Sequence, residues 1–189
     1  MNQERVMELV RELLRELGED PDRDGLRKTP ERVAKSWAFL TSGYRADPHA
    51  VINEAVFEAH TNNMILLRNI EVYSLCEHHM LPFYGRCHIG YISRDKVLGV
   101  SKLARIVDIY ARRLQIQERL TALIAADIRK AINAEGVGVV MECRHFCMMM
   151  RGVEKQNSVM TTSSVLGSFH NDAATRAEFM SLLRTPAPP

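Results

Sequence analysis

Four side chains that bind metals or protons stand in a row at Cys76, Glu77, His78 and His79. Cys-x-x-His is a common spacing with which one segment supplies two ligands to a zinc ion, and Cys76 and His79 have this spacing. His78 projects in a different direction from its neighbour His79, which makes it the weaker ligand candidate. The segment therefore predicts two zinc ligands, Cys76 and His79.

A second cluster, "CRHFC", contains Cys143, His145 and Cys147. In a strand these three side chains share one face, because side chains alternate with a period of two. Structural zinc sites are closed by four protein ligands, whereas catalytic sites keep one position for water. The spacing allows Cys76, His79 and Cys147 with water, or a closed site that includes His145. Unlinked core residues are the alternative, but two such clusters in one reduced chain favour a metal.

Basic residues at the start of a predicted helix suggest an anion site. Ser101 is expected to cap this helix, with Lys102 and Arg105 one turn apart on the side away from its apolar stripe. The first backbone N–H groups and the positive end of the helix dipole favour an anion there. An ordinary solvated helix face has the same pattern. Further basic residues could join the site: Arg151, Arg32 and Lys35.

Gln117 and Glu118 begin another predicted helix, whose residues Ile116 and Leu120 face inward. This pattern places Gln117 and Glu118 on the polar side. A carboxylate there can accept two hydrogen bonds from the N1–H and exocyclic amine of a guanine. A glutamate that complements the helix dipole is the simpler alternative.

The elements that must position these residues follow from hydrophobic periodicity. Thr29 and Pro30 are expected as N-cap and first residue of the second helix. Helices are predicted over residues 6–17, from 29 to about 43, from 101 through 110, over 116–132 and over 173–183. Strands are predicted over residues 64–75, 84–93, 136–150 and 157–169. This order indicates an α+β fold with an antiparallel sheet.

Composition narrows the class of protein. The 189 residues are 46% hydrophobic, which is enough for one domain, with an N-terminal helical region at 1–50 and a catalytic core at 51–183. The net charge of +2 gives no indication of nucleic-acid binding. No segment approaches the ~20 apolar residues of a membrane helix. The charged N-terminal segment lacks the features of a signal peptide, so we expect a cytoplasmic protein. Cys87 and Cys143 are expected to be ordinary half-buried strand residues.

The motifs together closely resemble GTP cyclohydrolase I of the zinc-dependent type. The resemblance extends over residues 20–180 and is carried by "TPERVAKSW", "CEHHMLPFYGRCHIGYI", "GVSKLARIVDIYARRLQIQERLT", "ECRHFCMMMRGV" and "TTSSVLGSF". The motifs occur in the family's order, and each is long enough to be specific.

The resemblance implies a role for each matching residue. Zn²⁺, with water in the open position, is implied on Cys76, His79 and Cys147. Proton transfer is implied for His145 and His78, and we expect Ser101 to serve as a further proton carrier. Triphosphate contacts are implied for Ser101, Lys102, Arg105 and Arg151, and from a neighbouring subunit for Arg32 and Lys35. Recognition of the guanine is implied for Gln117 and Glu118.

The implied reaction converts GTP and water to 7,8-dihydroneopterin triphosphate and formate, the first step of tetrahydrofolate and pterin biosynthesis. The implied fold is the tunnelling fold, in which the sheets of several subunits join into a barrel. The implied assembly is a homodecamer with active sites between subunits. Rival interpretations are another tunnelling-fold enzyme, which would use different metal or nucleophile motifs, and a zinc-stabilised scaffold protein without catalysis.

Overall fold

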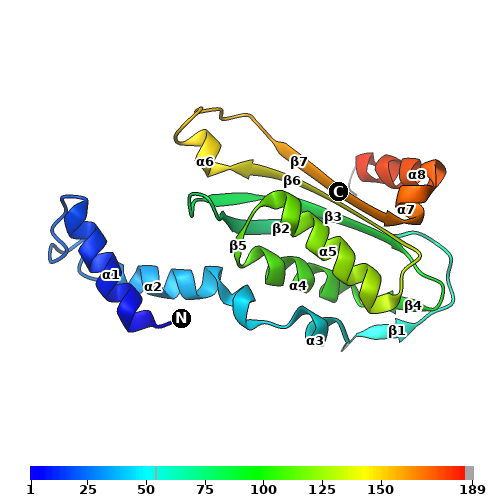
Figure 1. The fold of residues 1–189 in the computed structure, drawn as a ribbon, viewed down its shortest axis with the longest axis horizontal. Coiled ribbons are helices and arrows are strands. Elements are labelled where there is room, and N and C mark those ends of the chain that lie inside the picture. Colours follow the sequence, from blue (N-terminus) through cyan, green and yellow to red (C-terminus); the bar gives the residue numbers. More distant parts are fainter. Residues whose placement is uncertain (54, 186–189) are drawn as a thin grey trace. The chain divides into compact units, whose positions relative to one another are not determined.

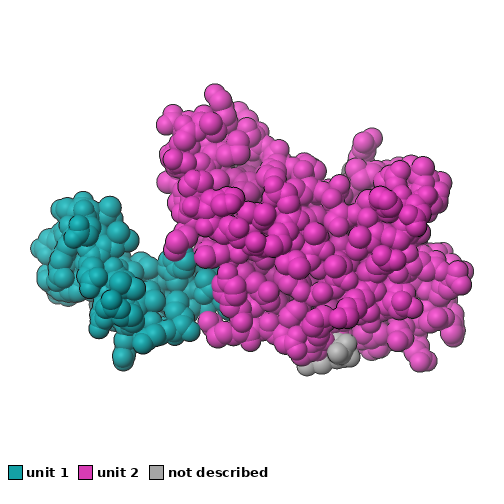
Figure 2. Space-filling view, viewed as in Figure 1, with its two compact units in different colours: residues 1–42 teal, residues 43–189 magenta. Residues whose placement is uncertain are grey.

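The computed structural model describes residues 1–53 and 55–185. The chain forms two compact units, Met1–Ser42 and Gly43–Pro189, coloured separately in Figure 2. Among the described helices, none is long and apolar enough to cross a membrane. The expectation of a single domain over the whole chain stays a prediction.

The first unit contains two helices, α1 (Gln3–Glu16) and α2 (Thr29–Leu40). The Asn2 side chain caps α1 by accepting a hydrogen bond from the Arg5 N–H at 3.0 Å. Gly18, with φ of +83°, follows the end of α1 as the sequence predicts. The predicted cap of α2 is wrong by one residue, because Lys28 is the N-cap and Thr29 already lies inside the helix.

The second unit is a mixed α+β structure, which confirms the predicted fold class (Figure 1). Its longer strands are β2 (Ile65–Cys76), β3 (Pro82–Ile92), β6 (Gly136–His145) and β7 (Met160–Gly167). Its longer helices are α4 (Val100–Ala111), α5 (Gln117–Ile132) and α8 (Ala173–Arg184). The short elements are η1 (Ser42–Arg45), α3 (Pro48–Asn53), β1 (Val56–Glu58), β4 (Lys96–Leu98), β5 (Leu114–Gln115), α6 (Phe146–Met149) and α7 (Ser168–Asn171).

The central sheet has the strand order β5-β2-β3-β6-β7. The pairings β2–β3, β3–β6 and β6–β7 are antiparallel, and the short pairing of β2 with β5 is parallel. Phe83 pairs with His145 at one end of the sheet, and Ile92 pairs with Gly136 at the other. The helices α4 and α5 lie side by side over one face (Figure 1).

Alternation along the strands separates two apolar clusters. Val139 belongs to the main core under α4 and α5, whereas its neighbour Val140 packs with Phe169 and Phe179 on the opposite face. This is expected because successive strand side chains point to opposite faces. The second face is therefore covered near α7 and α8, whereas Tyr73, Arg86 and Glu142 on the same face are exposed.

Two predicted element boundaries near the site are wrong. The helix α4 begins at Val100 and its N-cap is Gly99, so Ser101 lies inside the first turn and does not cap it. The strand β6 ends at His145, and Cys147 lies on the short helix α6 instead of continuing the strand. The reason for this early end is that the pairing of β3 with β6 stops at the Phe83–His145 pair.

Candidate metal centre and active site

The turn between β2 and β3, residues 76–81, brings the first two candidate ligands together. The Cys76 N–H donates to the Leu81 carbonyl at 2.9 Å, and the Met80 N–H donates to the Cys76 carbonyl at 2.7 Å. Met80 adopts a left-handed conformation, with φ of +56°, which tightens the turn. As a result, the Sγ of Cys76 lies 4.0 Å from the Nδ1 of His79.

Cys147 joins this pair from the short helix α6. The donor atoms of Cys76, His79 and Cys147 all lie within 4.8 Å of one another. Zinc binds sulfur at about 2.3 Å and imidazole nitrogen at about 2.0–2.1 Å, so the ligands of one tetrahedral ion lie about 3.5–4 Å apart. The three donors therefore fit a zinc ion with small adjustments, and two thiolates with one imidazole are a zinc-type donor set.

The electrostatics of the group also favour a cation. Burial raises the pKa of Cys147, and the nearby Cys76 raises it further. Two thiolates at this distance repel each other. A bound dication attracts both of them, which offsets the repulsion and favours the deprotonated form of both thiols.

His145 lies outside this donor group. Its Nε2 is 2.9 Å from the Oε1 of Gln117, and its ring stacks on Phe83 with centroids 4.7 Å apart and planes at 9°. Among the described residues, the clustered metal donors are Cys76, His79 and Cys147. This geometry supports the three-ligand alternative over the closed site.

Gln117 determines which nitrogen of His145 carries a proton. The Gln117 side-chain NH₂ donates to the Met141 carbonyl at 3.0 Å, to the Met160 carbonyl at 2.9 Å and to the Thr162 hydroxyl at 3.1 Å. The amide oxygen is therefore the atom that faces His145, and it can only accept. The Nε2 of His145 is assigned as the N–H donor, which leaves Nδ1 with a free lone pair.

The environment of His145 keeps its ring neutral at neutral pH. Burial lowers its pKa, and the negative charge of Glu118 partly offsets that effect. The structure thus brings Glu118, which is exposed at the start of α5, into the electrostatic range of His145. The expectation that Gln117 shares the polar side of the helix is wrong, because Gln117 is buried beside β6 and β7. Its predicted role with guanine stays a prediction.

The other two residues of the first motif have different surroundings. His78 is exposed, and its ring lies 6.3 Å from that of His79 at 85°, so the two imidazoles face different directions as expected. The carboxylate of Glu77 forms an ion pair with Arg119. Sequence reasoning missed Arg119, although a cation in the first turn of a helix is an unusual signal.

The predicted anion-binding residues lie in three places: beside His79, on α4 and on α2. Arg151 lies beside the candidate ligand His79, with its Nη1 3.4 Å from the Nε2 of His79. Ser101 lines a cavity of about 540 Å³ between α4 and residues 67–73 of β2. On α4, Arg105 is exposed as expected, but Lys102 is buried, so its predicted place on the solvated side is wrong.

The remaining two predicted anion-binding residues, Arg32 and Lys35, belong to α2 of the first compact unit. Lys35 forms an ion pair with Glu31 one turn earlier on the same helix. The predicted roles of Arg32 and Lys35 in a neighbouring subunit's site stay predictions.

The fold and the donor group define a class: an α+β protein with a candidate open zinc centre at the end of its central sheet. Comparison with known proteins identifies the class more closely. The family described as GTP cyclohydrolase I matches residues 6–184. This chain therefore belongs to the GTP cyclohydrolase I family of enzymes.

Similar proteins agree with this assignment over nearly their whole length. A protein of Leptospira biflexa is 58% identical over 177 residues, which cover 94% of this chain and 97% of that protein. A protein of Methylococcus capsulatus is 59% identical over 179 residues, covering 94% and 97%. A protein of Alkalilimnicola ehrlichii is 56% identical over 183 residues, covering 97% and 99%. All three are named GTP cyclohydrolase 1.

Proposed function

We propose that this protein is a zinc-dependent GTP cyclohydrolase. It hydrolyses and rearranges GTP to 7,8-dihydroneopterin triphosphate with release of formate, as the first step of tetrahydrofolate and pterin biosynthesis in the cytoplasm. The observation that carries the proposal is the convergence of Cys76, His79 and Cys147 within 4.8 Å, with His145 held outside the donor group. Family membership supports GTP as the substrate.

Cys76, His79 and Cys147 would hold the zinc ion in this proposal. Bound at these ligands, zinc supplies a Lewis acid that makes a water molecule acidic enough to react near neutral pH. The chain's own residues then bind the base and the phosphates and move the protons.

His145 is the principal proton carrier. Its Nε2–H is held by Gln117, so Nδ1 is the atom that exchanges protons with the substrate. Because the ring is neutral at pH 7, Nδ1 can take a proton during water attack on C8 of the guanine. It can then return that proton to the ring nitrogen whose bond to C8 breaks. His78 and Ser101 assist the later opening and closure of the ribose.

Guanine is held at the N-terminus of α5. Glu118 offers an exposed carboxylate that can accept from N1–H and the exocyclic amine. The Gln117 side chain is committed to β6, β7 and His145, so Gln117 contributes through its backbone N–H. Such N–H groups in the first turn of a helix have no partner within the helix, and the aliphatic Ile116 cannot cap them.

The triphosphate is bound by basic residues from more than one subunit. Contacts come from Ser101, Lys102, Arg105 and Arg151, and a neighbouring subunit adds Arg32 and Lys35. The strand order leaves β7 and most of β2 as edges of the sheet. Edges of this kind can pair with another chain. This supports a homodecamer in which the sheets of adjacent subunits join into a barrel and the active sites lie at subunit interfaces.

Incubation of the purified, zinc-loaded protein with GTP tests the proposal. We expect stoichiometric formate and a product that becomes fluorescent as neopterin after oxidation. Zinc binding without formate would support a scaffold protein instead. The absence of both tight zinc binding and formate release would support a different tunnelling-fold enzyme.

A further inference from the structure

The proposed function uses three of the four residues of the first motif and leaves Glu77 without a role. Glu77 lies between the candidate ligands Cys76 and His79, and its side chain is 31% exposed. Its carboxylate forms an ion pair with the guanidinium of Arg119, 42 residues later in the chain. Its backbone N–H donates to the Gln115 carbonyl at 3.0 Å. Glu77 is thus bound to the β5–α5 segment through both its side chain and its backbone.

Arg119 occupies a position where a cation is unfavourable. It is the third residue of α5, and the positive end of the helix dipole disfavours a positive side chain there. A cation at such a position requires compensation, and violations of local sequence rules concentrate at functional sites. Here the compensation comes from oxygen atoms on three different residues.

The planar, forked guanidinium group of Arg119 donates hydrogen bonds to three residues at once. Its Nε donates to the Oε1 of Gln115 at 3.0 Å, and its Nη2 donates both to the Leu114 carbonyl at 3.3 Å and to Glu77. Gln115 is itself buried and fixed, because its Nε2 donates to the Tyr110 carbonyl at 3.0 Å. A lysine has one ammonium group and could not reproduce this set of contacts.

The ion pair connects two segments that are otherwise weakly joined. The pairing of β2 with β5 consists of Leu75 with Leu114 and Cys76 with Gln115. Glu77 is adjacent to the candidate ligand Cys76, and Arg119 is adjacent to Glu118. The pair therefore spans the distance between the metal-binding turn and the guanine-binding end of α5.

We propose that Glu77 and Arg119 are a positioning pair that holds the 76–81 turn in register with the N-terminus of α5, so that a base bound at Glu118 presents C8 to the metal. This inference deepens the proposed function and rests on it. Partly exposed ion pairs contribute little to global stability. A displacement of about 1 Å between reacting groups can lower the rate about 100-fold. The pair therefore affects turnover far more than stability.

The test compares Glu77→Gln, Arg119→Met and Arg119→Lys with the wild type, each loaded with zinc. We expect kcat for formate release to fall at least about 10-fold in Glu77→Gln and Arg119→Met, with KM for GTP changed less than about 3-fold. Arg119→Lys keeps the charge but loses the fork, so it should recover only part of kcat. The Glu77→Gln, Arg119→Met double variant should be little worse than either single variant, because both remove the same contact.

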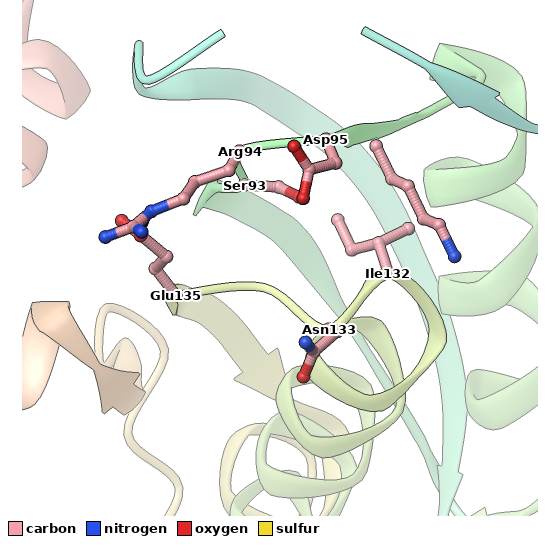
Figure 3. A pocket seen from close by; sticks show the side chains of 7 residues that line it. Ser93, Arg94, Asp95, Ile132, Asn133 and Glu135 are labelled. Carbon is pink, nitrogen blue, oxygen red and sulfur yellow. Dashed lines mark ion pairs between the residues drawn. The ribbon is translucent and has the colours of Figure 1, made fainter. Parts of the chain in front are cut away.

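A matched control is available at the opposite end of the sheet. Arg94 and Glu135 form an ion pair there, beside a cavity of about 360 Å³ (Figure 3). The Glu135 side chain is 34% exposed, close to the value for Glu77. Glu135→Gln should leave kcat within about 2-fold of the wild type. A control effect as large as that of Glu77→Gln would overturn the proposal.

Cobalt substitution provides a second readout that does not depend on turnover. Glu77→Gln should bind Co²⁺ with the thiolate charge-transfer intensity of the wild type, since Cys76 and Cys147 remain. GTP should perturb the d–d bands of the wild type, and at saturating GTP this perturbation should be at least halved in Glu77→Gln. An unchanged perturbation, or loss of Co²⁺ binding, would overturn the positioning role. Wild-type bands insensitive to GTP, without formate release, would instead contradict the proposed function.

Discussion

Two pairs of cysteines, Cys87 with Cys143 and Cys76 with Cys147, differ in what surrounds their sulfur atoms. Cys87 lies in the middle of β3, Cys143 lies two residues before the end of β6, and both are fully buried in the main core. Burial raises the pKa of both thiols, to about 12 for Cys143. Cys76 and Cys147 lie at the end of the sheet, where the chain turns and His79 joins them. Residue type alone therefore does not identify a ligand; the neighbours of the sulfur atom do.

The difference follows from where the backbone leaves the sheet. Within the sheet, neighbouring strands and the main core enclose the side chains of Cys87 and Cys143, so a thiolate there has neither water nor a cation. At the strand end, the 76–81 turn and α6 bring two thiols and an imidazole within 4.8 Å of one another. Cys143 and Cys147 are only four residues apart, which makes the contrast directly testable.

The largest predicted effect is that of Cys147→Ala compared with Cys143→Ala. Cys147→Ala removes a ligand, so we expect loss of tightly bound zinc and a fall in formate release of at least about 1,000-fold. Cys143→Ala should keep zinc and activity and lose about 1–2 kcal/mol of the free energy of unfolding, a typical cost of a core substitution. Metal analysis, formate release and denaturant unfolding measure these outcomes.

Retention of stoichiometric zinc by Cys147→Ala would contradict the assignment of Cys147 as a zinc ligand. Loss of zinc from a folded Cys143→Ala would instead assign Cys143 to the metal.

His145→Ala tests whether His145 is itself a metal ligand, because His145 lies between Cys143 and Cys147 in the sequence. We expect this variant to keep zinc and to lose about 100-fold to 10,000-fold in formate release, the usual contribution of a general acid–base residue. Zinc content and single-turnover formate release are the measurements. A metal-free variant would make His145 a ligand and favour the closed site.

The smallest predicted effect is an alkaline loss of stability caused by the core thiols. Their pKa values are raised in the folded state from an ordinary value of about 9, so the unfolded chain releases these protons at lower pH than the folded one. The stabilisation is therefore complete below about pH 9 and is lost as pH rises toward the folded pKa of Cys143, about 12. Between pH 8 and pH 10 each thiol should account for about 1 kcal/mol.

Denaturant unfolding at pH 8 and pH 10 under reducing conditions measures this effect. The difference between the two pH values should be about 1 kcal/mol smaller in Cys143→Ala than in the wild type. An identical pH dependence in the two proteins would mean that the folded core does not hold the Cys143 thiol in its protonated form.

Local sequence patterns predicted much of this architecture. The four longer strands and the helices α1, α2, α4, α5 and α8 follow from hydrophobic periodicity, which depends only on neighbouring residues. The chain between His145 and Met150 was predicted as strand but forms α6, because an apolar run of this length fits either conformation. The pairing of β3 with β6 decides between them by ending at the Phe83–His145 pair.

The supporting contacts of the site could not be read from the sequence in the same way. The hydrogen bond between His145 and Gln117 joins residues 28 positions apart, and the Glu77–Arg119 pair joins residues 42 positions apart. Spacing within a motif predicts which residues share a turn or a face. It does not predict which distant side chain meets them after the sheet has formed.

The central claim is that Cys76, His79 and Cys147 hold one zinc ion and leave its fourth position to solvent. X-ray absorption spectroscopy of the zinc-loaded protein tests it most directly. The account predicts two sulfur ligands at about 2.3 Å and two nitrogen or oxygen ligands at about 2.0–2.2 Å, with outer-shell scattering from a single imidazole. A second imidazole, a third sulfur or the absence of stoichiometric zinc would contradict it.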